Sequence, residues 1–169
     1  MPVTLVGATV NGRPNYLTVA HVGIMNHAHP AYITVGLGKM HYTNAGIKEN
    51  KTFSVNIPSE DMVAETDYCG IVTGRNTDKA ALFEAFYGEL KTAPMITECP
   101  VNIECVLRKK IHLGVHDLFL GEIVSVHVDQ EILDEEGEID FAKLSPFVFN
   151  QGEYWSLGKR IGIEGFSRA

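Results

Sequence analysis

Residues 101–128 read VNIECVLRKKIHLGVHDLFLGEIVSVHV and form two stretches of alternating side chains on either side of Gly114. From 101 to 113, apolar side chains take the odd positions, with Lys109 as the exception, and most even positions are polar. An alternation with period two is typical of a β-strand that buries one face. The segment 116–128 ends in the same pattern. The two stretches therefore predict a pair of long antiparallel strands.

The first half of the chain also reads as strands. The dipeptide Asn11-Gly12 separates the β-rich segments 3–10 and 15–21, and Asn-Gly is the strongest short signal for a hairpin. Residues 31–38 are apolar on both faces, which predicts a central strand, and residues 53–57 alternate. Because turn signals follow one another closely, we expect an antiparallel barrel, mainly β with short helices.

Three short helices are predicted between the strands, each introduced by a residue that commonly caps a helix, namely Thr43, Ser59 and Asp78. The first helix would cover residues 44–50 and the second would end near Gly70. The third would carry Ala81, Leu82, Ala85 and Phe86.

Length and charge exclude several classes of protein. The 169 residues fit a single domain over 1–169, and the formal net charge of −7 argues against non-specific binding of nucleic acid. Six of the acids lie between residues 131 and 140. No apolar run approaches the roughly 18 residues that cross a bilayer, so no membrane segment is expected.

The cysteines indicate the compartment. Cys69, Cys99 and Cys105 give an odd count without a Cys-x-x-Cys motif. We expect free thiols in the core of a cytoplasmic protein, since disulfides are rare in reducing compartments. The N-terminus has no basic region of the kind that opens a signal peptide.

Two loops could carry chemistry. Residues 36–47 lead from a strand through Lys39 and His41 to the helix start at Thr43, where unpaired N–H groups suit a phosphate. The alternative is that Thr43 only caps a helix and Lys39 is only solvated. Residues 70–79 place a hydroxyl and two cations before another helix start. They could hold an anionic group, or they could form an ordinary loop.

Other common sites are unsupported by the sequence. The seven histidines include no His-Glu-x-x-His motif and no zinc-finger spacing, so we expect no metal. There is no Gly-x-Gly-x-x-Gly motif after a strand, no P-loop and no Gly-x-Ser-x-Gly elbow.

Taken together, these stretches resemble the flavin reductase-like, FMN-binding split-barrel family, and within it the flavoredoxin-like branch. The resemblance runs over nearly the whole chain and rests on the order and spacing of several motifs. They are Pro14-Asn15 before residues 18–23, Leu37-Gly38-Lys39 with His41-Tyr42-Thr43 and Ile47, residues 51–58, Thr73-Gly74 with Asp78-Lys79, Glu104-Cys105, residues 116–124, and residues 154–158.

The resemblance implies a homodimeric split barrel that binds FMN without a covalent bond near the subunit interface. The residues that it assigns to the isoalloxazine ring and ribityl chain are Asn15, Thr18, Ala20 and His21. Lys39, His41 and Thr43 would hold the phosphate, and Asn56, Thr73, Gly74 and Lys79 would complete the site. An aromatic residue such as Phe149 would cover the ring, from this chain or from its partner.

The implied activity is that of an oxidoreductase. His116 would face the open side of the ring, where NAD(P)H or another electron donor arrives, and electrons would pass to free flavin or to a partner protein. Two alternatives stay open: an electron carrier without its own nicotinamide site, and a non-catalytic ligand-binding barrel.

The sequence departs from the family pattern at three places. Many members of the family carry Trp at the position of His21. The family's Ser-Gly pair is replaced by Thr73-Gly74 in this chain, and its Asp-Lys-Phe motif is replaced by Asp78-Lys79-Ala80. The first change alters the expected ring contact and the third removes an aromatic side chain.

Overall fold

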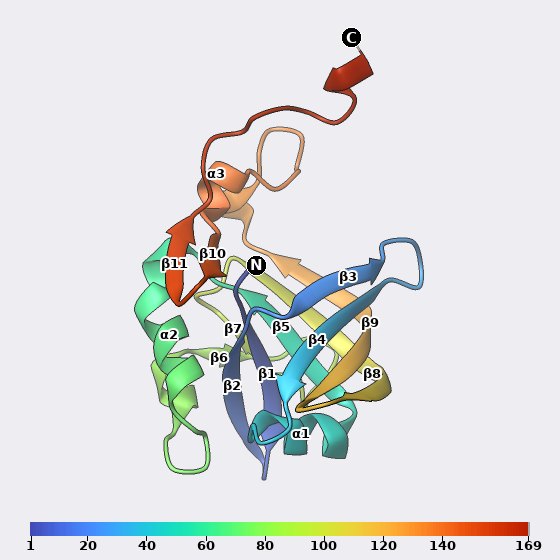
Figure 1. The fold of residues 1–169 in the computed structure, drawn as a ribbon, viewed down its shortest axis with the longest axis vertical. Coiled ribbons are helices and arrows are strands. Elements are labelled where there is room, and N and C mark those ends of the chain that lie inside the picture. Colours follow the sequence, from blue (N-terminus) through green and yellow to red (C-terminus); the bar gives the residue numbers. More distant parts are fainter. Residues whose placement is uncertain (169) are drawn as a thin grey trace.

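The structure, a computed structural model, describes residues 1–168 and is built around one curved antiparallel sheet (Figure 1). Its seven strands are β1 (Thr4–Val10), β2 (Arg13–Val19), β3 (Val22–Asn26), β4 (Tyr32–Gly38), β5 (Thr52–Ile57), β8 (Val101–Leu113) and β9 (His116–Val128). Hydrogen-bonded neighbours follow the order β2-β1-β5-β8-β9-β4-β3, and every pair is antiparallel. The predicted fold class, mainly β with short helices, is confirmed.

The remaining elements are short. Two small antiparallel ladders pair β6 (Ala85–Phe86) with β7 (Met95–Ile96), and β10 (Phe147–Asn150) with β11 (Glu153–Ser156). The α-helices are α1 (Thr43–Asn50), α2 (Val63–Ile71) and α3 (Phe141–Leu144). The single-turn helices are η1 (Glu60–Met62), η2 (Lys79–Leu82), η3 (Gln130–Ile132) and η4 (Phe166–Arg168). Over residues 1–168, no helix has both the length and the apolar character that crossing a bilayer requires.

Both predicted hairpins form. Asn11 (φ 50°) and Gly12 (φ 75°) both have positive φ, as a two-residue type I′ turn requires, and they join β1 to β2. Strands β8 and β9 pair from Val101 opposite Val128 to Leu113 opposite His116. Local turn chemistry and period-two patterning are therefore enough to set these two pairings.

The barrel interior is a single apolar core to which six of the seven sheet strands contribute. Val6, Leu17, Val35, Phe53 and Phe119 are among its members, and each is at most 3% exposed. The outer faces of β1 and β2 form a second core with α2, which contains Tyr16 and Cys69. Within the described chain, the end strands β2 and β3 are not paired with each other, so the barrel is split at this place.

All three cysteines are buried and free, as predicted. Burial raises the pKa of the Cys69 thiol to about 11, and it also raises the pKa of the Cys99 and Cys105 thiols. A buried thiol with a raised pKa is a poor nucleophile. The cysteines therefore act as small core side chains.

Several predictions of local structure were wrong. Thr43 is the first residue of α1 and not its cap, because the capping position falls on Tyr42 and no side chain caps this end. Ser59 precedes η1 without a side-chain cap. Asp78 does cap a helix, through the N–H of Ala80, but the helix is the single turn η2, and residues 85–86 form β6 instead.

The sheet also differs from the prediction in three respects. Strand β3 was not predicted, since it is short and lies at the edge of the sheet with much of its surface exposed. Strand β4 is second from the edge and not central, although β3 and β9 flank it. Residues 101–105 of β8 are buried on both faces, because the N–H groups of Glu89 and Leu90 bind the Glu104 carboxylate and residues 96–99 bind the Asn102 amide.

Candidate functional site

A cavity of about 330 Å³, here called the first cavity, lies beside the split in the barrel. Its walls come from the end of β2 and the following link, from β4, from α2, from the first residue of β9, and from β10 and β11. Six of the residues assigned to the site by resemblance line it, namely Thr18, Ala20, His21, His41, His116 and Phe149. Strands distant in sequence thus bring these side chains to one place.

Three imidazoles face the first cavity. The rings of His21 and His116 meet edge to face, with centroids 5.5 Å apart. Burial lowers the pKa of His41, and the nearby charges of Lys79 and His116 act in the same direction. His41 is therefore biased towards its neutral form near pH 7, while its ring nitrogens keep their capacity to donate and accept hydrogen bonds.

The position of His116 depends on a buried carboxylate beside it. Asp117 is 2% exposed, and its carboxylate lies 2.6 Å from His112 Nδ1 and 3.7 Å from Lys110 Nζ. Burial alone would raise the pKa of Asp117, but the hydrogen bond to His112 and the charges of Lys110 and Lys39 outweigh it and hold the pKa below its usual value. Asp117 therefore stays ionised and ties together the hairpin that presents His116.

A second cavity of about 220 Å³ continues from the first and shares His41, Gly70 and Ile71 with it. The two cavities together are called the groove below. Five further residues assigned by resemblance line the second cavity, namely Asn15, Thr43, Thr73, Gly74 and Lys79. Asn15 and Thr43 are fixed by each other, because Asn15 Nδ2 donates to Thr43 Oγ1 at 2.7 Å.

Lys79 is a buried cation in the wall of the second cavity. It is 3% exposed, and its Nζ donates to the carbonyl oxygen of Cys69 at 2.6 Å. Within residues 1–168, no carboxylate lies within 4 Å of this ammonium group. Burial lowers its pKa, since a charge without a counter-ion is costly to remove from water. The second cavity therefore suits an anion.

The loop before η2 packs too closely for any side chain at position 74. A Cβ atom built on Gly74 would lie 1.9 Å from Asn15 Oδ1 and 3.0 Å from Tyr42. Glycine at this position brings the backbone of the loop against the Asn15–Thr43 pair. The second cavity is consequently shaped by backbone as well as by side chains.

Two predicted site residues lie outside the groove. Asn56 is fully buried in the middle of the sheet, where its Nδ2 donates to the carbonyl oxygen of Leu5 at 2.7 Å. Lys39 is exposed, its N–H binds the carbonyl oxygen of Val115, and it lines neither cavity. The structure gives Asn56 a supporting role within the sheet, and it does not bring Lys39 to the groove.

The groove also contains residues to which the sequence assigned no role. Tyr154 lines the first cavity, and its hydroxyl group donates to Asp67 Oδ1 at 2.9 Å. Asp67 and Ile71 reach the same cavity from α2. Tyr154 belongs to a motif that carries the resemblance, which was the available signal, but nothing in the sequence pointed to α2.

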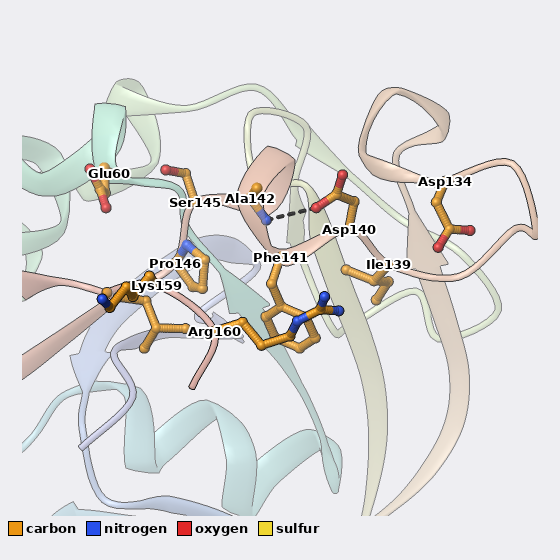
Figure 2. Close-up of a pocket in the computed structure, with 12 residues that line it drawn as sticks. Glu60, Asp134, Ile139, Asp140, Phe141, Ala142, Ser145, Pro146, Lys159 and Arg160 are labelled. Carbon is orange, nitrogen blue, oxygen red and sulfur yellow. Dashed lines mark hydrogen bonds between the residues drawn. The ribbon is translucent and has the colours of Figure 1, made fainter. Parts of the chain in front are cut away.

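A larger cavity lies elsewhere, between residues 134–146 and the segment 157–160 (Figure 2). It measures about 730 Å³ and is lined by Glu60, Asp134, Asp140, Lys159 and Arg160, among others. It shares no residue with the groove, and one wall is the exposed segment 157–160, which runs away from the barrel (Figure 1). We therefore place the candidate site in the groove.

Comparison with known proteins agrees with this architecture. Residues 1–158 match the family described as flavin reductase like domain. The chain therefore belongs to the flavin reductase-like family, and its fold is the split barrel of that family.

Three relatives illustrate the range of the similarity. The crystal structure of flavoredoxin from Methanosarcina acetivorans is 43% identical, with a TM-score of 0.95 over 99% of this chain and 90% of that one. Flavoredoxin of Desulfovibrio vulgaris (Miyazaki F) is 35% identical, with a TM-score of 0.91 over 99% and 92% of the two chains. A ferric-chelate reductase (NAD(P)H) of Archaeoglobus fulgidus is 33% identical over 112 residues, which cover 62% of this chain and 63% of that one.

Proposed function

We propose that the chain is an FMN-dependent oxidoreductase that accepts electrons, as hydride from NAD(P)H, and passes them to free flavin or to a partner protein. The observation that carries this proposal is the pairing of two unlike cavities in one groove. The first is walled by apolar groups and three imidazoles, and the second contains the unpaired buried cation Lys79. This pairing fits a flat ring joined to a phosphate.

The residues would divide the work as follows. Lys79, with the Asn15–Thr43 pair and the backbone of Gly74, would hold the phosphate. His21 would border the ring in the first cavity. Bound FMN would supply the electron-transfer chemistry, and the protein would set its position and its electrostatic surroundings.

His116 has the geometry of a group that acts on an arriving donor. It is half-buried at the first residue of β9, and Asp117 fixes the hairpin beneath it. An imidazole in this position can donate or accept a hydrogen bond through its ring nitrogens. We assign it the role of orienting the electron donor.

The direct test is to purify the protein, record its visible spectrum and titrate it anaerobically with NADH and with NADPH. The proposal predicts one flavin per chain and bleaching of the visible bands by at least one nicotinamide. A colourless protein that cannot be reconstituted with FMN would refute the proposal and would leave a non-catalytic ligand-binding barrel.

A second candidate is an electron carrier without its own nicotinamide site. It is favoured by the similarity to two proteins named flavoredoxin at 43% and 35% identity. Stopped-flow mixing separates the two candidates. Rapid reduction by NADH or NADPH supports the reductase, whereas reduction only by another redox protein supports the carrier.

We also propose that two copies of the chain associate around the groove. Three apolar side chains beside it are widely exposed: Met40 at 86%, Val115 at 77% and Ile71 at 73%. Exposed apolar groups that gather at one place are typical of a protein interface. Light scattering after gel filtration should give twice the chain mass of 18.6 kDa, and a monomer would refute this part of the proposal.

A further inference from the structure

A hydrogen bond between two half-buried side chains closes part of the first cavity. The Tyr154 hydroxyl group on β11 donates to Asp67 Oδ1 on α2 at 2.9 Å, and both residues line the cavity. The Tyr154 ring also packs against Phe149, with centroids 5.2 Å apart, and Phe149 lines the same cavity. The Tyr154–Asp67 pair therefore fixes the part of the wall that β10 and β11 contribute.

Asp67 differs from the other lining residues in its charge. Among the described residues around the first cavity there is no other acid, and there is no lysine or arginine. Within residues 1–168, no cationic nitrogen lies within 4 Å of the Asp67 carboxylate. Because the pKa of His41 is lowered by burial, that imidazole contributes little positive charge near pH 7. A ring bound in this cavity would lie beside a carboxylate that has no ion-pair partner.

Tyr154 is suited to moderate the charge of this carboxylate. Burial raises the pKa of Tyr154 to about 12, and the hydrogen bond to Asp67 and the charge of Asp67 act in the same direction. The hydroxyl group therefore keeps its proton and remains a donor. A hydrogen bond to an ionised acceptor is roughly twice as strong as one between neutral groups. It draws the negative charge of Asp67 towards Tyr154 and so weakens its effect on a neighbouring ring.

This charge matters because reduction makes a flavin ring more negative. A hydride brings one proton and two electrons to a neutral ring, so the ring gains one unit of negative charge. A carboxylate beside the ring opposes this gain, since like charges repel more strongly in a partly desolvated cavity than in water. The reduced cofactor is then held less tightly than the oxidised one, which lowers the reduction potential.

We propose that Asp67 lowers the reduction potential of the bound flavin, and that Tyr154 limits this effect by its hydrogen bond to the carboxylate. The inference rests on the proposed function, since that function places the flavin ring in the first cavity. Asp67 acts on the ring by its charge. Tyr154 acts through Asp67 and is a positioning residue.

The test measures the reduction potential of bound FMN by anaerobic titration against redox dyes. Asp67→Asn keeps the shape of the side chain without its charge. It should raise the ratio of the affinities for reduced and oxidised FMN at least tenfold, which for a two-electron couple is a rise of about 30 mV. Tyr154→Phe removes the donor and should lower this ratio at least threefold. In the double variant the ratio should equal that of Asp67→Asn, because Tyr154 acts only through the carboxylate.

Two matched controls come from α2 itself. Glu65→Gln removes a carboxylate and Tyr68→Phe removes a phenolic hydroxyl group, and neither residue lines the groove. Neither control should change the affinity ratio. Thermal melts of the flavin-free variants and fluorescence titrations with oxidised FMN establish that each variant folds and binds the cofactor.

The other outcomes separate the two roles from the proposed function. An unchanged or lowered ratio in Asp67→Asn overturns the role of Asp67. A ratio that Tyr154→Phe leaves unchanged or raises, or a Tyr154→Phe effect that persists in the double variant, overturns the role of Tyr154. In these cases FMN still binds and the proposed function stands, whereas a wild-type chain that binds no FMN overturns both.

Discussion

The substitution Lys79→Met should have opposite effects on the free chain and on the flavin complex. Within residues 1–168, Lys79 Nζ donates a hydrogen bond to the carbonyl oxygen of Cys69 and forms no ion pair. Losing that bond costs about 1.5–3 kcal/mol because its donor is charged, and removing an uncompensated buried charge offsets the cost with several kcal/mol of recovered desolvation. We therefore expect the free energy of unfolding of the flavin-free chain to stay the same or to rise by about 1–2 kcal/mol.

The same substitution should weaken FMN binding. A hydrogen bond to a charged group contributes about 1.5–3 kcal/mol, so its loss raises the dissociation constant roughly 10- to 150-fold. At a flavin concentration of about 1,000 times the wild-type dissociation constant, ligand stabilisation is about 4 kcal/mol. A 100-fold weaker variant would retain about 1.4 kcal/mol. The melting temperature shift caused by FMN should then fall from about 8–16 °C to about 3–6 °C.

The measurement is a thermal melt of each variant with and without FMN, together with a direct titration of FMN. Lys48→Met is the matched control, since Lys48 is exposed on α1 outside the groove and carries the same charge. A Lys79→Met variant with wild-type FMN affinity would refute the assigned role. A decrease of more than about 2 kcal/mol in the free energy of unfolding of the flavin-free variant would also refute it, because Lys79 would then be a structural residue.

Three further outcomes are expected. His116→Ala should leave FMN affinity within about threefold but slow reduction by NAD(P)H at least tenfold in stopped flow, and unchanged reduction would exclude a role for this imidazole. Gly46→Ala places a Cβ atom 2.2 Å from the β1 backbone and should cost about 2–3 kcal/mol by denaturant titration, whereas Gly158→Ala meets open space and should cost almost nothing. Burial holds the pKa of His41 below 6.5 in the folded chain, so between that lowered pKa and 6.5 the unfolded chain binds more protons. Stability should therefore fall as the pH decreases through this window, and His41→Asn should flatten the decrease in thermal melts recorded from pH 7.5 to 5.

The parts of the fold that local chemistry determines could be predicted from the sequence. The turn at Asn11-Gly12 needs only two residues with positive φ, and the β8–β9 pairing needs only an alternating pattern on each side of Gly114. Burial on both faces could not be predicted in the same way. Residues 101–105 appear half polar in sequence, but residues 89–90 bind Glu104 and residues 96–99 bind Asn102, which removes the solvent face.

The site was predictable only where the resemblance and the topology agree. Asn56 and Lys39 belong to motifs of the family, yet period and spacing do not say whether a strand residue faces a cavity or another strand. Asn56 lies on the face of β5 that also carries Ser54, and this face is closed, since Ser54 donates to the carbonyl oxygen of Pro94 and Asn56 to that of Leu5. The burial of Lys79 is equally invisible in sequence, because it depends on the carbonyl oxygen of Cys69 coming from another element.

The net charge of −7 is distributed unevenly over the structure, with acids and cations in different places. Six acids lie between residues 131 and 140, and among the described residues none of them lines the groove or the adjoining cavity of about 360 Å³ between the β1–β2 turn and residues 74–79. The cations Arg13, Arg75 and Lys79 line this adjoining cavity instead. A phosphate-bearing ligand is therefore attracted to the groove and repelled by the acidic segment, because potentials within about 10 Å are only partly screened by salt. An acidic protein can in this way bind an anionic cofactor without any change in its overall balance of charge.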